Sequence, residues 1–63
     1  MSEKKIVVDT DRRTGQVFKV RESGGRFWAY KDGRNLGDAP TLDDAIVIIK
    51  GNVDGSVRKI KID

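Results

Sequence analysis

The 63-residue sequence contains no cysteine and no histidine. Without cysteine no disulfide can form, and without either residue a structural zinc site is not expected. The usual general base and the soft nucleophile of enzymes are also missing, which argues against catalysis. We therefore expect no cofactor, no metal and no enzymatic activity. A cysteine-free composition is typical of a reducing compartment, so we predict a cytoplasmic location.

Long apolar runs are absent as well. No segment approaches the ~20 residues of a membrane span, and residues 1–5, of which three are charged, lead into only three apolar residues. We expect no signal peptide, no anchor and no membrane partner. A chain of this length allows one domain, residues 1–63, that buries about 60% of its unfolded surface. We expect residues 1–4 to be disordered.

The excess of positive charge is small. Thirteen lysines and arginines stand against ten acidic residues, which gives a net charge of +3. So many charges are typical of a well-solvated surface. Their positions, more than their total, decide whether they form a basic patch for an acidic partner.

Residues 16–31 organise the rest of the chain, because they predict two strands joined at Gly24-Gly25. A glycine pair tolerates the positive φ angles of a two-residue hairpin turn. Such a turn fixes the register as Ser23–Arg26, Glu22–Phe27, Arg21–Trp28, Val20–Ala29 and Lys19–Tyr30. Alternation then separates an apolar set from a basic and aromatic set. The apolar set is Phe18, Val20, Phe27 and Ala29, and the other is Lys19, Arg21, Arg26, Trp28 and Tyr30.

The remaining segments predict two further strands, over residues 4–9 and 56–62. Residues 9–15 are polar and end in glycine, as a turn does. Asp9 and Asp11 lack the later acidic ligands of a calcium loop, so a plain loop is favoured. Residues 31–38 hold two glycines and indicate a turn or loop, with at most a brief extended piece at Leu36.

A helix is predicted to begin at Thr41. The run Thr41-Leu42-Asp43-Asp44 matches the capping-box pattern, and its acidic residues suit the positive end of the helix dipole. Helical spacing places Leu42, Ala45, Ile46 and Ile49 on one buried stripe. Lys50 and Gly51 are typical of a helix end.

The expected fold is α+β, with the order β-β-β-α-β. We expect an antiparallel sheet with one helix packed on one face and the other face open. The side chains expected beneath the helix are Ile6, Val8, Phe18, Val20, Phe27, Ala29, Ile60 and Ile62.

The open face is the candidate site. Its predicted members are Lys19, Arg21, Arg26, Trp28, Tyr30, Lys59 and Lys61. Basic side chains in this arrangement would contact phosphates of DNA or RNA while the rings stack on bases, or the sheet would enter a major groove. A competing interpretation places both rings beneath residues 12–15 or 32–38 as a small additional core. Arg21 would then stack on Trp28 across the strands.

A second functional class is also open. We expect the strand over residues 4–9 or the strand over residues 56–62 to lie at an edge of the sheet, and an open edge accepts a strand from a partner. The alternative function is therefore a protein-interaction or self-association module, which forms a homodimer or binds a protein partner.

Three short segments resemble a family of small bacterial proteins that is known only as a domain of unknown function. They are Trp28-Ala29-Tyr30-Lys31, Thr41-Leu42-Asp43-Asp44-Ala45 and Asp54-Gly55-Ser56-Val57-Arg58. This resemblance implies a β-rich sheet with one helix and implies no activity. Through Phe27-Trp28-Ala29-Tyr30-Lys31 and the helix at Thr41, the layout also resembles the arm-type DNA-binding domains of integrases. Those domains place the open sheet face in the major groove.

Overall fold

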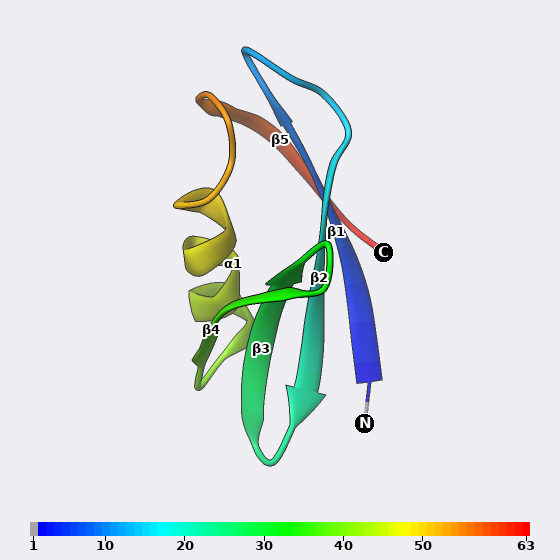
Figure 1. The fold of residues 1–63 in the computed structure, drawn as a ribbon, viewed down its shortest axis with the longest axis vertical. Helices are drawn as coiled ribbons and strands as arrows, with labels where there is room; N and C mark the ends of the chain where they lie inside the picture. Colours follow the sequence, from blue (N-terminus) through cyan, green and yellow to red (C-terminus); the bar gives the residue numbers. More distant parts are fainter. Residues whose placement is uncertain (1) are drawn as a thin grey trace.

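The computed structural model describes residues 2–63 as a five-stranded sheet with one helix on one face (Figure 1). The elements in chain order are β1 (Ser2–Thr10), β2 (Gln16–Ser23), β3 (Arg26–Lys31), β4 (Arg34–Ala39), α1 (Leu42–Lys50) and β5 (Val57–Ile62). All pairings are antiparallel, and the strand order across the sheet is β4-β3-β2-β1-β5. The predicted α+β class, with one helix on one face and the other face open, is confirmed.

The central hairpin has the predicted register in all of its pairs, from Ser23–Arg26 to Lys19–Tyr30. Gly24 and Gly25 adopt φ angles of 61° and 75°, the positive values that a two-residue primed turn requires. Because the turn sets the register, it also decides which side chains of β2 and β3 share a face.

The fourth strand is a correction to the predicted order, since residues 31–38 were expected to be a turn or loop. Asp32 and Gly33, with φ angles of 51° and 80°, form a second tight turn, and Arg34–Ala39 pairs with β3. An irregularity opposite Ala29 and Tyr30 leaves Leu36 as the extra residue, and its side chain packs against the core. Two of the six residues in β4 are Asn and Gly, which have low strand propensity, so pairing and helix contact hold the strand extended.

The helix follows the sequence prediction closely. Thr41 Oγ1 accepts a hydrogen bond from the backbone N–H of Asp44 at 3.1 Å, which confirms Thr41 as the N-cap. Ala45, Ile46 and Ile49 are buried. The helix packs on β4, β3 and β2. No helix within residues 2–63 combines the length and the apolar character needed to cross a membrane.

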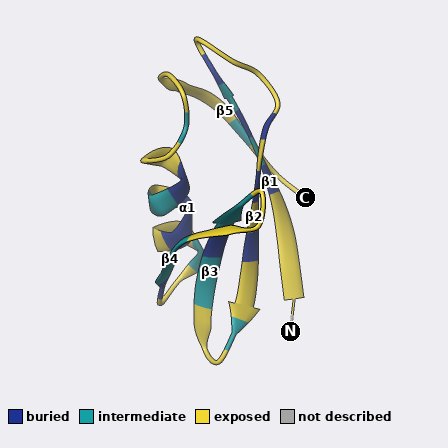
Figure 2. Ribbon diagram, in the orientation of Figure 1, coloured by how far each residue is buried: buried dark blue, intermediate teal, exposed yellow. Residues whose placement is uncertain are grey.

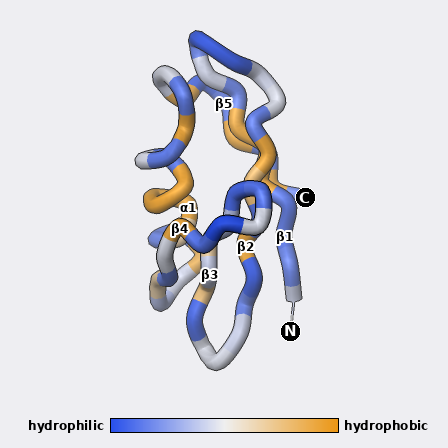
Figure 3. The backbone as a smooth tube through the Cα atoms, viewed as in Figure 1, coloured by the Kyte–Doolittle hydropathy of each residue, from blue (hydrophilic) through white to orange (hydrophobic). Residues whose placement is uncertain are grey.

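The core lies between the helix and the middle of the sheet (Figures 2 and 3). Its buried members are Ile6, Val8, Phe18, Val20, Ala29, Ala39, Ala45 and Ile49. The prediction that the helix covers Ile62 is wrong, because this side chain remains 48% exposed. The physical reason is position: α1 lies over the β4 side of the sheet, and β5 is the strand at the other edge. Ile60, one pair further along β5, is half-buried.

Strand β1 begins earlier than predicted. Residues 2–4, expected to be disordered, pair with Glu22, Arg21 and Val20 of β2. The reason is the length of β2, which continues to Ser23 and so offers backbone partners along the whole of β1. Met1 lies outside the described residues.

A buried polar cluster closes the end of the sheet where β1 meets the loop that follows it. Thr10 and Gln16 are each only 4% exposed. The Thr10 hydroxyl accepts hydrogen bonds from Gln16 Nε2 at 3.1 Å and from the backbone N–H of Arg13 at 3.0 Å, and it donates to the carbonyl of Asp54. The backbone N–H of Asp54 donates to Gln16 Oε1 at 2.9 Å. This arrangement, the Thr10 cluster, ties the loop after β1 to the loop before β5.

The carboxylates of the same loop also bond to backbone groups. Asp9 Oδ1 accepts from the N–H of Gly15 at 2.8 Å, and Asp11 Oδ1 accepts from the N–H of Ser56 at 2.7 Å. Gly55, with a φ of 98°, leaves no space for a Cβ atom beside Asp11 and Thr10. Asp9 therefore closes the loop after β1 on itself, and Asp11 joins that loop to the one before β5. Within residues 2–63 no cluster of acidic side chains is arranged to hold a metal ion.

Candidate nucleic-acid interface

The sheet face opposite the helix carries all seven predicted site residues. The register places Lys19 and Arg21 on it from β2, Arg26, Trp28 and Tyr30 from β3, and Lys59 and Lys61 from β5. The other members are Glu3, Lys5, Val7 and Asp9 from β1, Val17 and Ser23 from β2, and Asn35 and Asp38 from β4. We call this surface the open face.

One row of the open face runs across four strands through Glu3, Arg21, Trp28 and Asp38. The Arg21 guanidinium turns away from the ring opposite it, because its Nε lies 3.3 Å from Glu3 Oε2. The expected stacking of Arg21 on Trp28 is therefore wrong. In the described part of the chain, the one cation over an aromatic ring is Lys31, whose Nζ lies 5.3 Å from the centre of the Phe18 ring.

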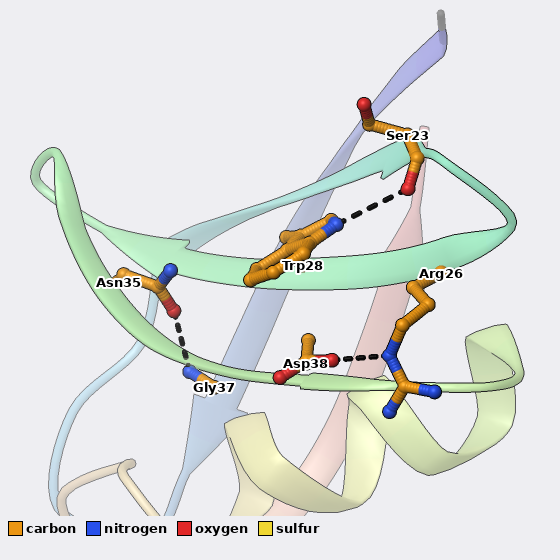
Figure 4. A network of polar contacts seen from close by, with 6 residues as sticks. All are labelled: Ser23, Arg26, Trp28, Asn35, Gly37 and Asp38. Atoms are coloured by element: carbon orange, nitrogen blue, oxygen red, sulfur yellow. Dashed lines mark hydrogen bonds and ion pairs between the residues drawn. The ribbon is translucent and has the colours of Figure 1, made fainter.

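Trp28 is half-buried and held by its neighbours within the sheet (Figure 4). Its indole Nε1–H donates to the carbonyl of Ser23 at 3.2 Å, and beside it Arg26 forms an ion pair with Asp38. We call Ser23, Arg26, Trp28 and Asp38 the Trp28 cluster. A shallow hollow of about 330 Å³ adjoins the ring.

Neither loop of the competing interpretation lies over Trp28. Residues 32–38 form the tight turn and β4, which lie in the sheet beside β3. Residues 12–15 follow the far end of β1, and Gln16, the first residue of β2, is five residues from Arg21, or about 16 Å along the strand. The partial burial of Trp28 therefore comes from its neighbours on the open face.

The next row contains Asn35, Tyr30, Lys19 and Lys5. Beside it lies a groove of about 470 Å³. The groove is lined by Glu3, Lys5, Val17, Phe18, Lys19, Arg21, Tyr30, Asp32 and Gly33. Sequence reasoning missed Lys5, although the alternation of β1 carries the signal: Ile6 and Val8 face the core, so Lys5 and Val7 face the other way.

The basic residues of the open face differ in their acidic neighbours. In the described part of the chain, the ion pairs join Glu3 to Lys19 at 3.6 Å, Glu3 to Arg21 at 3.3 Å, and Arg26 to Asp38. Lys5, Lys59 and Lys61 form no such pair within residues 2–63, even though Lys59 lies opposite Asp9 in the register. The open face therefore has a charge-compensated part around Trp28 and a part with unpaired lysines toward β5.

Comparison with known proteins found no match to this chain. No family model matches the sequence, and no curated protein and no solved structure matches it either. The resemblances to the family of unknown function and to the integrase domains stay predictions.

Proposed function

We propose that this protein is a small, non-enzymatic nucleic-acid-binding module and that the open face is its contact surface. The main support for this proposal is the position of the predicted site residues in the fold. The fold puts every predicted site residue, together with Lys5, on the one sheet face that the helix does not cover. Two aromatic rings lie among the basic side chains, and this combination suits a partner that has both phosphates and bases.

The charge balance of the open face supports the same partner. Its basic members are Lys5, Lys19, Arg21, Arg26, Lys59 and Lys61, and its acidic members are Glu3, Asp9 and Asp38. The lysines of the open face that form no ion pair within residues 2–63 lie on β1 and β5, where phosphates reach them with no ion pair to break. Lys19 and Arg21 become available to phosphate only when their ion pairs with Glu3 break.

The test is a titration of the protein with a fluorescently labelled oligonucleotide at several salt concentrations. We expect binding to weaken steeply with salt, because each phosphate contact releases a counterion. Lys61→Gln should weaken binding and reduce the salt slope by about 0.7–0.9. Lys50→Gln is the matched control, since it removes the same charge from the last turn of the helix, off the open face. No binding at low salt, or equal effects of the two variants, would refute the proposal.

One observation favours a second candidate function, a protein-interaction module. Strand β5 is an edge strand outside the contact area of the helix, and Val57 and Ile62 on it are exposed. Such an edge accepts an added strand. Sedimentation equilibrium separates the possibilities: a concentration-dependent dimer supports self-association, and a monomer at high protein concentration argues against it.

A further inference from the structure

The width of the sheet limits how the open face can meet a nucleic acid. Neighbouring strands lie ~4.8 Å apart, so the five strands span about 19 Å from β4 to β5. The major groove of B-DNA is ~12 Å wide and admits one helix or a two-stranded ribbon. The added strand β4 lies directly beside β3, which carries both rings. The open face is therefore too wide to lie flat in a duplex groove.

The indole of Trp28 offers a ring face and no free donor. Its N–H is already bonded to the Ser23 carbonyl, so the polar atom that would read a base edge is occupied. What remains is the π surface, which stacks on any base with little sequence preference. Bases inside a duplex are stacked on their neighbours, whereas those of a single strand are available to a ring.

The spacing of the two rings also favours an unstacked strand. Trp28 and Tyr30 are two residues apart on β3, which places them ~6.6–6.8 Å apart along the strand. The rise per base in a stacked strand is ~3.4 Å. Successive bases can occupy both rings only when the nucleic acid is extended, and a single strand extends readily.

The groove beside Tyr30 is large enough to admit one base and has apolar and cationic side chains along it. Its volume of about 470 Å³ lies within the usual range of small-ligand sites, about 300–1,000 Å³. Val17 and Tyr30 supply apolar surface, and Lys5 and Lys19 supply cations for an adjacent phosphate. Glu3 and Asp32 also line the groove, so cations and carboxylates both border it.

We propose that the ligand of the open face is single-stranded nucleic acid, bound with one base in the groove against Tyr30 and the next on Trp28. This inference rests on the proposed function and narrows it to one class of nucleic acid. The phosphates follow Lys5 and Lys19, and recognition is tolerant of sequence because stacking provides the contact to the bases.

The experiment compares three labelled probes by fluorescence anisotropy: a twelve-nucleotide DNA strand, the same sequence as RNA, and the DNA duplex. We expect one or both single strands to bind at least tenfold more tightly than the duplex. Equal or tighter binding of the duplex overturns the inference and leaves the proposed function intact. Failure of all three probes at low salt removes the proposed function itself.

Variants at Tyr30 test the role of its ring. Tyr30→Leu keeps an apolar side chain and removes the ring, so affinity for the single strand should fall about 5- to 150-fold. Tyr30→Phe keeps the ring and should bind as the original protein does. Unchanged affinity of Tyr30→Leu would overturn the base contact. Trp28 fluorescence and circular dichroism confirm that each variant is folded, and the comparison of probes on the original protein does not depend on any variant.

Discussion

Two polar clusters lie toward opposite ends of the sheet, and they differ in burial. In the Thr10 cluster, Thr10 and Gln16 are almost fully buried, and their side chains bond to the backbone of two loops. In the Trp28 cluster, the indole is half-buried, and the Arg26–Asp38 pair is partly open to solvent. Burial makes each bond of the first cluster necessary for the fold, whereas solvent can replace the bonds of the second.

The comparison teaches which polar residues of a small domain are available for function. A buried hydroxyl that bonds to several groups cannot be released without cost, since the backbone N–H of Arg13 would lose its acceptor. A partly exposed ion pair contributes little to stability, so its members are free to exchange partners. Substitutions in and around the two clusters test this difference in burial.

Thr10→Val should be the most damaging of these changes. Valine has nearly the same shape but cannot accept from Arg13 or Gln16, nor donate to Asp54. Unsatisfied buried groups cost ~1–3 kcal/mol each, and a domain this small has only about 3–5 kcal/mol in total. We expect a largely unfolded protein by circular dichroism and thermal melting. Thr14→Val makes the same chemical change at an exposed loop position and should melt like the original.

Trp28→Ala should destabilise the protein by about 1–2 kcal/mol, within the common range for single substitutions. The reason is that the ring is half-buried and bonds to one carbonyl. A chemical denaturation curve measures the loss. Phe27→Ala should cost more, ~3 kcal/mol, because Phe27 packs against the core on the helix side. The reverse order of the two losses would mean that the two faces of β3 are assigned backwards.

Glu3→Gln should separate binding from stability. Its ion pairs with Lys19 and Arg21 join side chains that are 44–57% exposed, so the free energy of unfolding should change by less than about 1 kcal/mol. Affinity for nucleic acid should rise several-fold, because both cations become available to phosphate. A melt and an anisotropy titration on the same sample check the two parts. Weaker binding of Glu3→Gln would instead show that Glu3 holds Lys19 and Arg21 in the positions that contact the nucleic acid.

The smallest effect is expected for the Arg26–Asp38 pair. A double-mutant cycle with Arg26→Ala and Asp38→Ala should give a coupling energy of about 0–1 kcal/mol, as for other ion pairs that are partly open to solvent. A coupling above ~2 kcal/mol would show that the Trp28 cluster stabilises the fold as the Thr10 cluster does. Chemical denaturation of the four proteins provides the measurement.

Local patterns in the sequence were enough to predict the hairpin register, the helix and the open face. Gly24-Gly25 fixes the turn, and the turn fixes which residues lie opposite one another. The same reasoning predicted the face on which all the candidate site residues lie. Glu3 was missed because the start of β1 has few apolar residues and its strand character comes from pairing with β2. Lys5 was missed although it lies within the predicted strand, where Ile6 and Val8 indicate its face.

Long-range contacts account for the parts that the sequence did not reveal. Strand β4 has weak strand propensity and depends on the Asp32-Gly33 turn and on the packing of the helix. The Thr10 cluster joins residues far apart in the chain. No local sequence pattern predicts that the Gln16 side chain forms hydrogen bonds with the backbone of Asp54. The position of the helix over the β4 side, which leaves Ile62 exposed, also follows from packing alone.

The pairing of β1 with β5 has a consequence for how the chain reaches its folded state. Strands β2, β3 and β4 each pair with a neighbour along the chain through a tight turn, but β5 must return to the opposite edge of the sheet after the helix. Strand β1 therefore has one partner close in the chain, β2, and one distant partner, β5. The pairs from β1 to β4 form between neighbours in the chain, and they leave the far edge of β1 open until β5 joins it. The β1–β5 pairing joins segments far apart in the chain, so it carries a larger cost in loop-closure entropy than the pairings through tight turns.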